Sequence, residues 1–467
     1  MKYCLTHTFL LLLFCVLPFK GQSQNEPTLN QLIDRRQYTA VIDKVETLTA
    51  SDSADLNTMH SIGQAFEGLL RYRKAYDYYS YCLKQDTTNI DYINALARTA
   101  IYIGKVKEAE NLFHKVLKAD SLNFYANNQL ARLYYQIREY DKAIERYNIL
   151  IDHNEQNPSL LTSLGDCYSK KEQYFPAVTS YFLAYNINRE NASLASNLIN
   201  SMLHLGGEYI NEAITICDTA LYYNPDNKFL LQNKGMALYM NKNYAEADTL
   251  YTSLMETGDS TYITLKYGGI CRYHAGQYLR AIEPLEAALT LDTTSVDICI
   301  YLGSALGKTY DRKRALALFQ KAEENMQPPK SYLTQIKMFR AETYMKNADY
   351  RVAEKMYYEL WNELPDRIDF LGQIDKLYPT DIFTIKDEKQ LQRALFIKIL
   401  YTKQALEKDV DKDFLFFRHG MLEKIYNEMF FRQIESMSML APDGKTSKIS
   451  ILDIREIMNQ LPNEKTN

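Results

Sequence analysis

Small and aromatic residues recur along this chain at a spacing of 34 residues. In the copy that begins at Phe124, counted as position 1, Ala143 stands at position 20 and Tyr147 at position 24. The apolar residues of this copy follow the period of an amphipathic helix twice, which predicts helices over residues 125–136 and 141–151. A period of this length indicates stacked pairs of helices, since neither helix can bury its apolar stripe alone.

Position 20 fixes the register, because it is alanine in nine copies and Val41 in a first, divergent copy. The nine alanines are Ala75, Ala109, Ala143, Ala177, Ala213, Ala247, Ala281, Ala315 and Ala353. They are 34 residues apart except for a 36-residue step containing Gly206-Gly207 and a 38-residue step containing Pro328-Pro329. We expect a longer turn at the glycines. At the prolines we expect a helix that runs past its usual end and is stopped there.

The unit resembles the tetratricopeptide repeat (TPR), whose pattern has Leu-Gly at positions 7 and 8, Tyr at 11, Ala at 20, an aromatic at 24 and Ala at 27. The best matches are Leu164-Gly165, Tyr168, Ala177, Tyr181 and Ala184, and then Leu302-Gly303, Ala315, Phe319 and Ala322. The proline of position 32 survives only as Pro225 and Pro365, and the tryptophan of position 4 in no copy. The resemblance covers residues 22–365. It implies an all-α solenoid of about nine to ten helix-turn-helix units with a concave binding face.

The repeat register is lost after about residue 366. Apolar spacing there predicts long helices over 389–406 and 411–440, a turn at 442–444 and a short helix over 450–461. The last unit of a solenoid exposes the face on which a further unit would pack, so we expect this region to be a helical cap.

The first residues are typical of a secretory signal. Lys2 precedes the apolar run Phe9–Leu17, which Pro18 ends. Small residues then lead to a predicted cleavage between Ser23 and Gln24. The apolar run is shorter than the roughly 18 residues that a membrane-spanning helix needs, and no later stretch reaches that length.

The predicted domains are therefore a signal peptide over 1–23, a TPR solenoid over 24–365 and a capping region over 366–467. This organisation predicts an exported protein of the periplasm or cell envelope without a transmembrane helix. A lipid anchor on Cys15 is a less favoured alternative, because bulky residues precede that cysteine where small ones are expected.

Charge and composition exclude several classes of function. The chain has 54 Lys and Arg against 58 Asp and Glu, so no basic excess is available to neutralise nucleic-acid phosphates. The histidines are isolated and give no metal spacing, and we expect no catalytic residue, cofactor or metal. An odd number of irregularly spaced cysteines follows the predicted signal, which gives no disulfide framework and suits buried small side chains. They are Cys82, Cys167, Cys217, Cys271 and Cys299.

The run Gly303–Thr309 is similar to a phosphate-binding loop. Three residues separate its glycines, however, where that loop needs four. The run also falls in the first helix of a copy, where Gly303 is simply the small residue of position 8. We therefore expect no nucleotide site.

The concave face is where we expect a partner to bind. Positions 2, 5, 9, 12 and 13 share one side of the first helix of each unit. The residues predicted to form this binding groove are Asn94, Arg98, Tyr102, Asn128, Arg132, Tyr135, Tyr239, Tyr273 and His274. Asn and Arg recur 34 residues apart, which makes a cradle for a carboxylate or an acidic segment. The Lys-Asn clamp of chaperone-binding TPR proteins is not reproduced.

The favoured interpretation is a non-catalytic protein–protein interaction scaffold of the bacterial cell envelope, which holds a peptide or a partner helix in its concave groove and takes part in an envelope complex. The alternative is a glycan-binding or outer-membrane transport accessory protein, because some outer-membrane glycan receptors are built on TPR-like helices. An enzyme sited in residues 366–467 is the least favoured class.

Overall fold

The computed structural model describes residues 27–45, 55–153, 157–325, 328–408 and 410–462. The chain divides into two compact units, Met1–Asn188 and Arg189–Asn467, which are described in turn. The predicted signal peptide, residues 1–23, lies outside the described residues.

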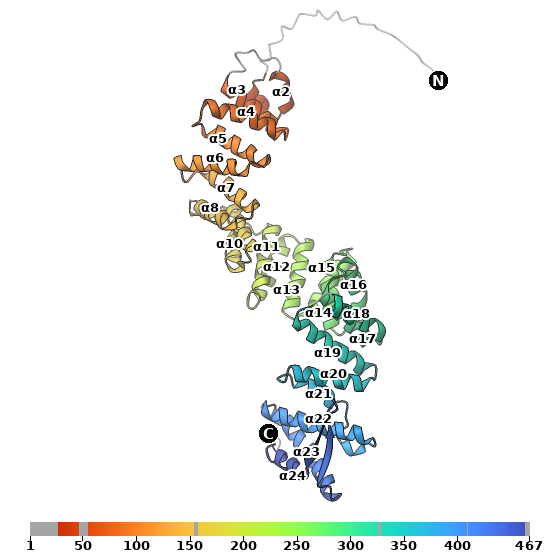
Figure 1. Ribbon diagram of the computed structural model, residues 1–467. Helices are drawn as coiled ribbons and strands as arrows, with labels where there is room; N and C mark the ends of the chain where they lie inside the picture. Colours follow the sequence, from red (N-terminus) through yellow and green to blue (C-terminus); the bar gives the residue numbers. More distant parts are fainter. Residues whose placement is uncertain (1–26, 46–54, 154–156, 326–327, 409, 463–467) are drawn as a thin grey trace, which may run out of the picture. The chain divides into compact units, whose positions relative to one another are not determined.

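The N-terminal unit contains five consecutive helix pairs in its described residues (Figure 1). They are α1 (Leu29–Asp34), α2 (Tyr38–Val45), α3 (Leu56–Gly68), α4 (Tyr72–Gln85), α5 (Ile90–Tyr102), α6 (Val106–Ala119), α7 (Phe124–Gln136), α8 (Tyr140–His153), α9 (Pro158–Lys170) and α10 (Tyr174–Ile187). The helices predicted over 125–136 and 141–151 correspond to α7 and α8 within two residues at each end.

The C-terminal unit begins with five further pairs in its described residues. They are α11 (Ala192–Leu205), α12 (Tyr209–Tyr223), α13 (Lys228–Met240), α14 (Tyr244–Glu256), α15 (Tyr262–His274), α16 (Tyr278–Leu291), α17 (Val296–Lys308), α18 (Arg312–Asn325), α19 (Lys330–Lys346) and α20 (Tyr350–Glu363). The predicted all-α solenoid of TPR-like helix pairs is therefore confirmed.

In several pairs the two helices meet where a small residue of the first faces a ring of the second. All nine alanines of position 20 are fully buried, at 0% exposure. A Cβ built on Gly165, at position 8, would lie 2.6 Å from the Tyr181 ring of position 24, and one on Gly235 would lie 2.6 Å from the Tyr251 ring. The ring thus occupies the volume that a larger residue at position 8 would need. This contact fixes the spacing of the helices in a pair.

The two irregular steps of the repeat have different structural outcomes. Gly206 and Gly207, with φ of 68° and 57°, make the expected longer turn between α11 and α12. The expectation at the prolines is wrong: α18 has an ordinary 14 residues, and the following helix α19 is the long one, with 17. Pro329 is the N-cap of α19, a place where proline's missing N–H costs little.

The capping region contains α21 (Asp369–Asp375), the short 3₁₀ turn η2 (Ile382–Thr384), α22 (Glu388–Glu407), α23 (Lys412–Phe431), β1 (Ser436–Leu440), β2 (Thr446–Ser450) and α24 (Ile451–Asn459). The helices predicted over 389–406 and 450–461 are confirmed as α22 and α24, within two residues at each end.

The single helix predicted over 411–440 is wrong, because α23 ends at Phe431. Gln433 has a φ of 57°, which turns the chain out of the helix, and β1 then pairs antiparallel with β2. Met437 lies opposite Ile449 in this hairpin, and both pack against the core of the cap. The predicted turn at 442–444 connects the two strands.

A buried charge cluster joins three helices of the cap. Arg418 on α23 is fully buried and donates to Asp375 Oδ2 of α21 at 3.1 Å and to the Lys398 carbonyl of α22 at 2.7 Å. The Lys398 ammonium lies 3.2 Å from Asp375 Oδ1. Burial lowers the pKa of Lys398, while Asp375 opposes that shift. Replacing one member would leave the others charged in a dry environment.

A second buried carboxylate connects the last repeat helix to the cap. Glu354 on α20 is 2% exposed, and its Oε1 accepts a hydrogen bond from the Tyr378 hydroxyl at 2.7 Å. The Arg393 Nε of α22 lies 3.6 Å from Glu354 Oε2. The cap is therefore attached by ionic contacts as well as by apolar burial.

Adding a methyl group at position 8 should destabilise the protein. We expect Gly165→Ala to lower the free energy of unfolding by about 1–3 kcal/mol, because its Cβ would overlap the Tyr181 ring. Gly420→Ala is the matched control, since Gly420 is also helical and its added Cβ meets nothing within 4 Å. Thermal denaturation followed by circular dichroism measures both. Equal melting temperatures for the two variants would contradict the contact.

Neutralising Glu354 should weaken the attachment of the cap. We expect Glu354→Gln to cost about 3–5 kcal/mol, because Arg393 would be left buried without its counter-charge. Glu359→Gln, on the same helix with its side chain 55% exposed, should change stability little. Urea unfolding of the full chain, followed by Trp361 fluorescence, compares the two. A Glu354→Gln curve that coincides with wild type would show that the contact contributes nothing.

Candidate functional site

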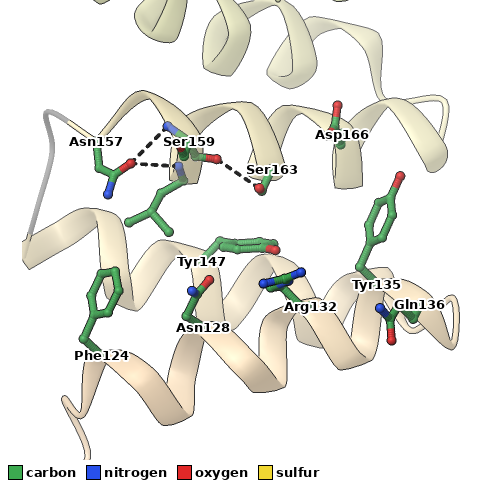
Figure 2. Close-up of a pocket in the computed structure, with 11 residues that line it drawn as sticks. Phe124, Asn128, Arg132, Tyr135, Gln136, Tyr147, Asn157, Ser159, Ser163 and Asp166 are labelled. Atoms are coloured by element: carbon green, nitrogen blue, oxygen red, sulfur yellow. Dashed lines mark hydrogen bonds between the residues drawn. The ribbon is translucent and has the colours of Figure 1, made fainter. Parts of the chain in front are cut away.

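A groove of about 460 Å³ opens between first helices of successive pairs in the N-terminal unit (Figure 2). Helices α7 and α9 supply most of its walls. Its lining residues are Phe124, Asn128, Arg132, Tyr135, Gln136, Tyr147, Asn157, Ser159, Leu160, Ser163 and Asp166. Three residues predicted from the sequence, Asn128, Arg132 and Tyr135, are therefore brought together here.

Arg132 is the cation of this groove. Its side chain is exposed, and within the described parts of the chain no hydrogen bond or ion pair engages its guanidinium. Asn128, one helical turn earlier, and Tyr135 are half-buried on the same wall. The buried Tyr147 from α8 also lines the groove, and burial raises the pKa of its hydroxyl to about 12, which keeps it neutral.

Asp166 on α9 occupies the position equivalent to Arg132 in the next repeat. Its Oδ1 accepts a hydrogen bond from the Tyr181 hydroxyl at 2.6 Å. Burial raises the pKa of this carboxyl, and the Tyr181 hydrogen bond and the charge of Lys170 oppose the shift. The groove therefore has a cation on one wall and a carboxyl group on the other.

Arg98 occupies the equivalent position one repeat earlier, but its guanidinium is already engaged. Its Nε and Nη2 both donate to the Glu67 carboxylate, the Nη2 contact being 2.7 Å, and its Nη1 donates to the Tyr125 hydroxyl at 2.9 Å. The pair lies in a neighbouring groove of about 350 Å³. A ligand carboxylate would have to displace Glu67 to reach Arg98.

The neighbouring repeats explain why two equivalent arginines differ. Glu67 stands at position 12 of the repeat before Arg98, whereas Ile101 holds position 12 before Arg132. Tyr125 stands at position 2 after Arg98, whereas the shorter Ser159 follows Arg132. Comparing positions 12 and 2 of adjacent repeats could have identified this difference from the sequence. The sequence of a single repeat does not show whether its arginine is paired.

Two other predicted residues lie near Arg98. Asn94 is half-buried, and within the described residues its buried Oδ1 has no hydrogen-bond donor. Tyr102 is 60% exposed, and its ring stacks on Tyr72 of the preceding repeat at a centroid distance of 4.2 Å. Tyr102 therefore lines the Arg98 groove and also contributes to the contact between repeats.

The remaining predicted residues form an aromatic cluster in the C-terminal unit. His274 stacks on Tyr244 at 4.3 Å, and its ring centroid lies 5.5 Å from that of Tyr273. The ring centroid of Tyr301, on α17, lies 5.2 Å from that of Tyr273 and 5.3 Å from that of His274. Tyr273 is 8% exposed and its hydroxyl hydrogen bonds to Ser304 at 2.8 Å, so it has a packing role.

Tyr239 belongs to the same region through Tyr267, whose ring centroid lies 5.1 Å away. Burial raises the pKa of the Tyr239 hydroxyl and lowers the pKa of the His274 imidazole. Both groups are therefore neutral near pH 7. Their assignment to a binding groove stays a prediction.

Other sequence features have structural explanations. Within the described residues the five cysteines are free and buried, and burial raises the pKa of Cys167, Cys217 and Cys271 to about 12. Gly303 lies inside helix α17, where its missing side chain accommodates Phe319. Among the described residues, no group of three or more potential ligands is placed to hold a metal ion. None of the described helices has the length and apolar character needed to cross a bilayer.

Comparison with known structures gives partial likenesses to repeat proteins. A tetratricopeptide repeat protein from Parabacteroides merdae shares 18% identity over 62% of this chain and 98% of its own, with a TM-score of 0.31. The TPR protein YrrB, described as having an unusual peptide-binding site, shares 18% over 44% and 97%, with a TM-score of 0.35. A thermophilic TPR protein from Thermus thermophilus shares 18% over 40% and 100%, with a TM-score of 0.29. A comparison with curated proteins found no significant match.

The family model for the tetratricopeptide repeat matches residues 94–159 and, overlapping them, 128–174. These residues include Arg132 and every residue that lines the groove around it. The same pairing of helices, with buried alanine at position 20, continues on both sides of the matched segment. The family is generally non-catalytic. Residues 94–174 of the chain therefore match the tetratricopeptide repeat model, and the described helices before and after them have the same paired arrangement.

Proposed function

We propose that the groove around Arg132 binds an extended segment of a partner protein through an acidic group. The observation that supports this most directly is the difference between the two equivalent arginines. Arg98 is neutralised by Glu67, whereas Arg132 has no counter-ion among the described residues and is exposed within a groove. A guanidinium in this setting suits a carboxylate, which it can bind through two parallel hydrogen bonds.

The other walls of the groove fit a peptide. Asn128 offers an amide that both donates and accepts hydrogen bonds, as a peptide backbone requires. Phe124 is 47% exposed at one end, and Tyr135 lies at the other, so apolar side chains of a ligand would have rings to pack against. A volume of about 460 Å³ accommodates a few residues, with the rest of the ligand continuing outside.

The proposed setting is the bacterial cell envelope. This part of the proposal rests on the signal-like sequence of residues 1–23, where a charged residue precedes a short apolar run and small residues. Export with removal of these residues would place the scaffold in an envelope complex. No chemical step is proposed, because the described grooves are lined by groups suited to binding.

Loss of the free guanidinium should weaken peptide binding. Peptides that bind the full chain are selected from a random displayed library, and their affinities are measured by fluorescence polarisation. We expect Arg132→Gln to raise Kd about tenfold or more, which corresponds to about 1.4 kcal/mol. Arg138→Gln is the matched control, since Arg138 lies in the turn after α7, outside the groove, and the change in net charge is the same.

Two results would contradict this site. If the selected peptides have no acidic group, the role proposed for a ligand carboxylate is wrong. Equal affinity of the two variants would place binding elsewhere on the chain.

A new carboxylate at position 12 should inactivate the groove without touching Arg132. We expect Ile101→Glu to reproduce the Glu67–Arg98 pair one repeat later, and so to compete with the ligand for the guanidinium. Binding of the selected peptides should fall about tenfold. Raised salt should reduce the difference in affinity between this variant and the wild type, because it screens both ion pairs. The control is Ile101→Gln, which has the same shape without the charge. Equal losses in the two variants would show that packing, and not the ion pair, controls the groove.

A further inference from the structure

A second groove with different chemistry lies in the C-terminal unit, between the first helices α11 and α13. Its volume is about 190 Å³. The residues that line it are Ala192, Ser193, Ser196, Asn197, Asn200, Asn227, Phe229 and Asn233. None of these lining residues carries a charge, whereas the groove around Arg132 has charged groups on both walls.

Some polar side chains of this groove can form further hydrogen bonds. Within the described residues, the side chains of Ser193, Ser196 and Asn200 make no hydrogen bond, and the buried Asn233 Nδ2 lacks an acceptor. Each serine hydroxyl and each asparagine amide can both donate and accept. These side chains therefore suit a ligand whose polar groups also donate and accept hydrogen bonds.

Phe229 adds an apolar surface beside these groups. It is the second residue of α13, and it is 72% exposed although it is a large aromatic residue. An exposed ring next to amides and hydroxyls presents one flat apolar face and several polar contacts to the same ligand. Among biological ligands, the pyranose ring of a sugar has this combination, with hydroxyls around its edge and a C–H face.

We propose that this groove binds a neutral carbohydrate, with one sugar ring stacked on Phe229 and its hydroxyls paired with Ser193, Ser196 and Asn200. The absence of charge in the lining leaves nothing to attract an anionic sugar or an acidic peptide. The volume is below the roughly 300–1,000 Å³ of pockets that enclose a whole small molecule. The groove therefore suits one unit of an oligosaccharide, whose neighbouring units extend along the open surface.

This inference is independent of the peptide groove, since it concerns other residues in the other unit. The test uses isothermal titration calorimetry of the full chain with four probes: maltohexaose, cellohexaose, chitohexaose and mannohexaose. We expect one of these neutral hexasaccharides to bind. For that probe, Phe229→Ala and Asn200→Ala should each raise Kd about tenfold.

Tyr222→Ala is the matched control, because Tyr222 is an 82% exposed ring at the end of α12 that does not line the groove. Its affinity should equal that of the wild type. Failure of all four sugars to bind at millimolar concentration would overturn the inference, as would unchanged affinity in both groove variants. Loss of binding of the selected acidic peptides in Phe229→Ala would also overturn it, by showing that this groove takes a peptide.

Discussion

The contact between a small residue at position 8 and a ring at position 24 is the constraint on which the structure depends. Tyr181 fills the space above Gly165, and the same relation recurs at Gly63 with Tyr79 and at Gly303 with Phe319. Because the contact lies inside a helix pair, it sets the distance between the two helices of that repeat. The first helices are consequently presented at regular intervals, and residues 34 apart can form one surface.

Much of this architecture could be predicted from the sequence, because the contact is local and repeated. Ala143 and Tyr147 are separated by one helical turn, so the periodicity alone places both on the buried face. The end of α23 could not be predicted in the same way. The apolar spacing up to Met429 continues through Ile434, whereas the alternating residues of the hairpin are too few to distinguish strand from helix. Pairing with β2 makes residues 436–440 a strand and not a continuation of the helix.

The residues of the binding groove could also be predicted only in part from the sequence. The sequence indicates which side of each first helix faces the groove, and Asn128, Arg132 and Tyr135 do line one cavity. It does not indicate whether an arginine is available, since Glu67 reaches Arg98 from 31 residues away. In the C-terminal unit the predicted Tyr273 packs against its neighbours. The serines and asparagines of the uncharged groove at Asn200 are common surface residues, which give no binding signal in the sequence.

The engagement of Arg98 by a residue of the preceding repeat has a consequence for how such arrays diversify. A duplicated repeat inherits its cation, and the exchange of one surface residue in the repeat before it can conceal or expose that charge. The buried alanines and rings need not change. Recognition could therefore migrate from repeat to repeat over evolutionary time by single codon changes, leaving the scaffold and its folding energetics intact.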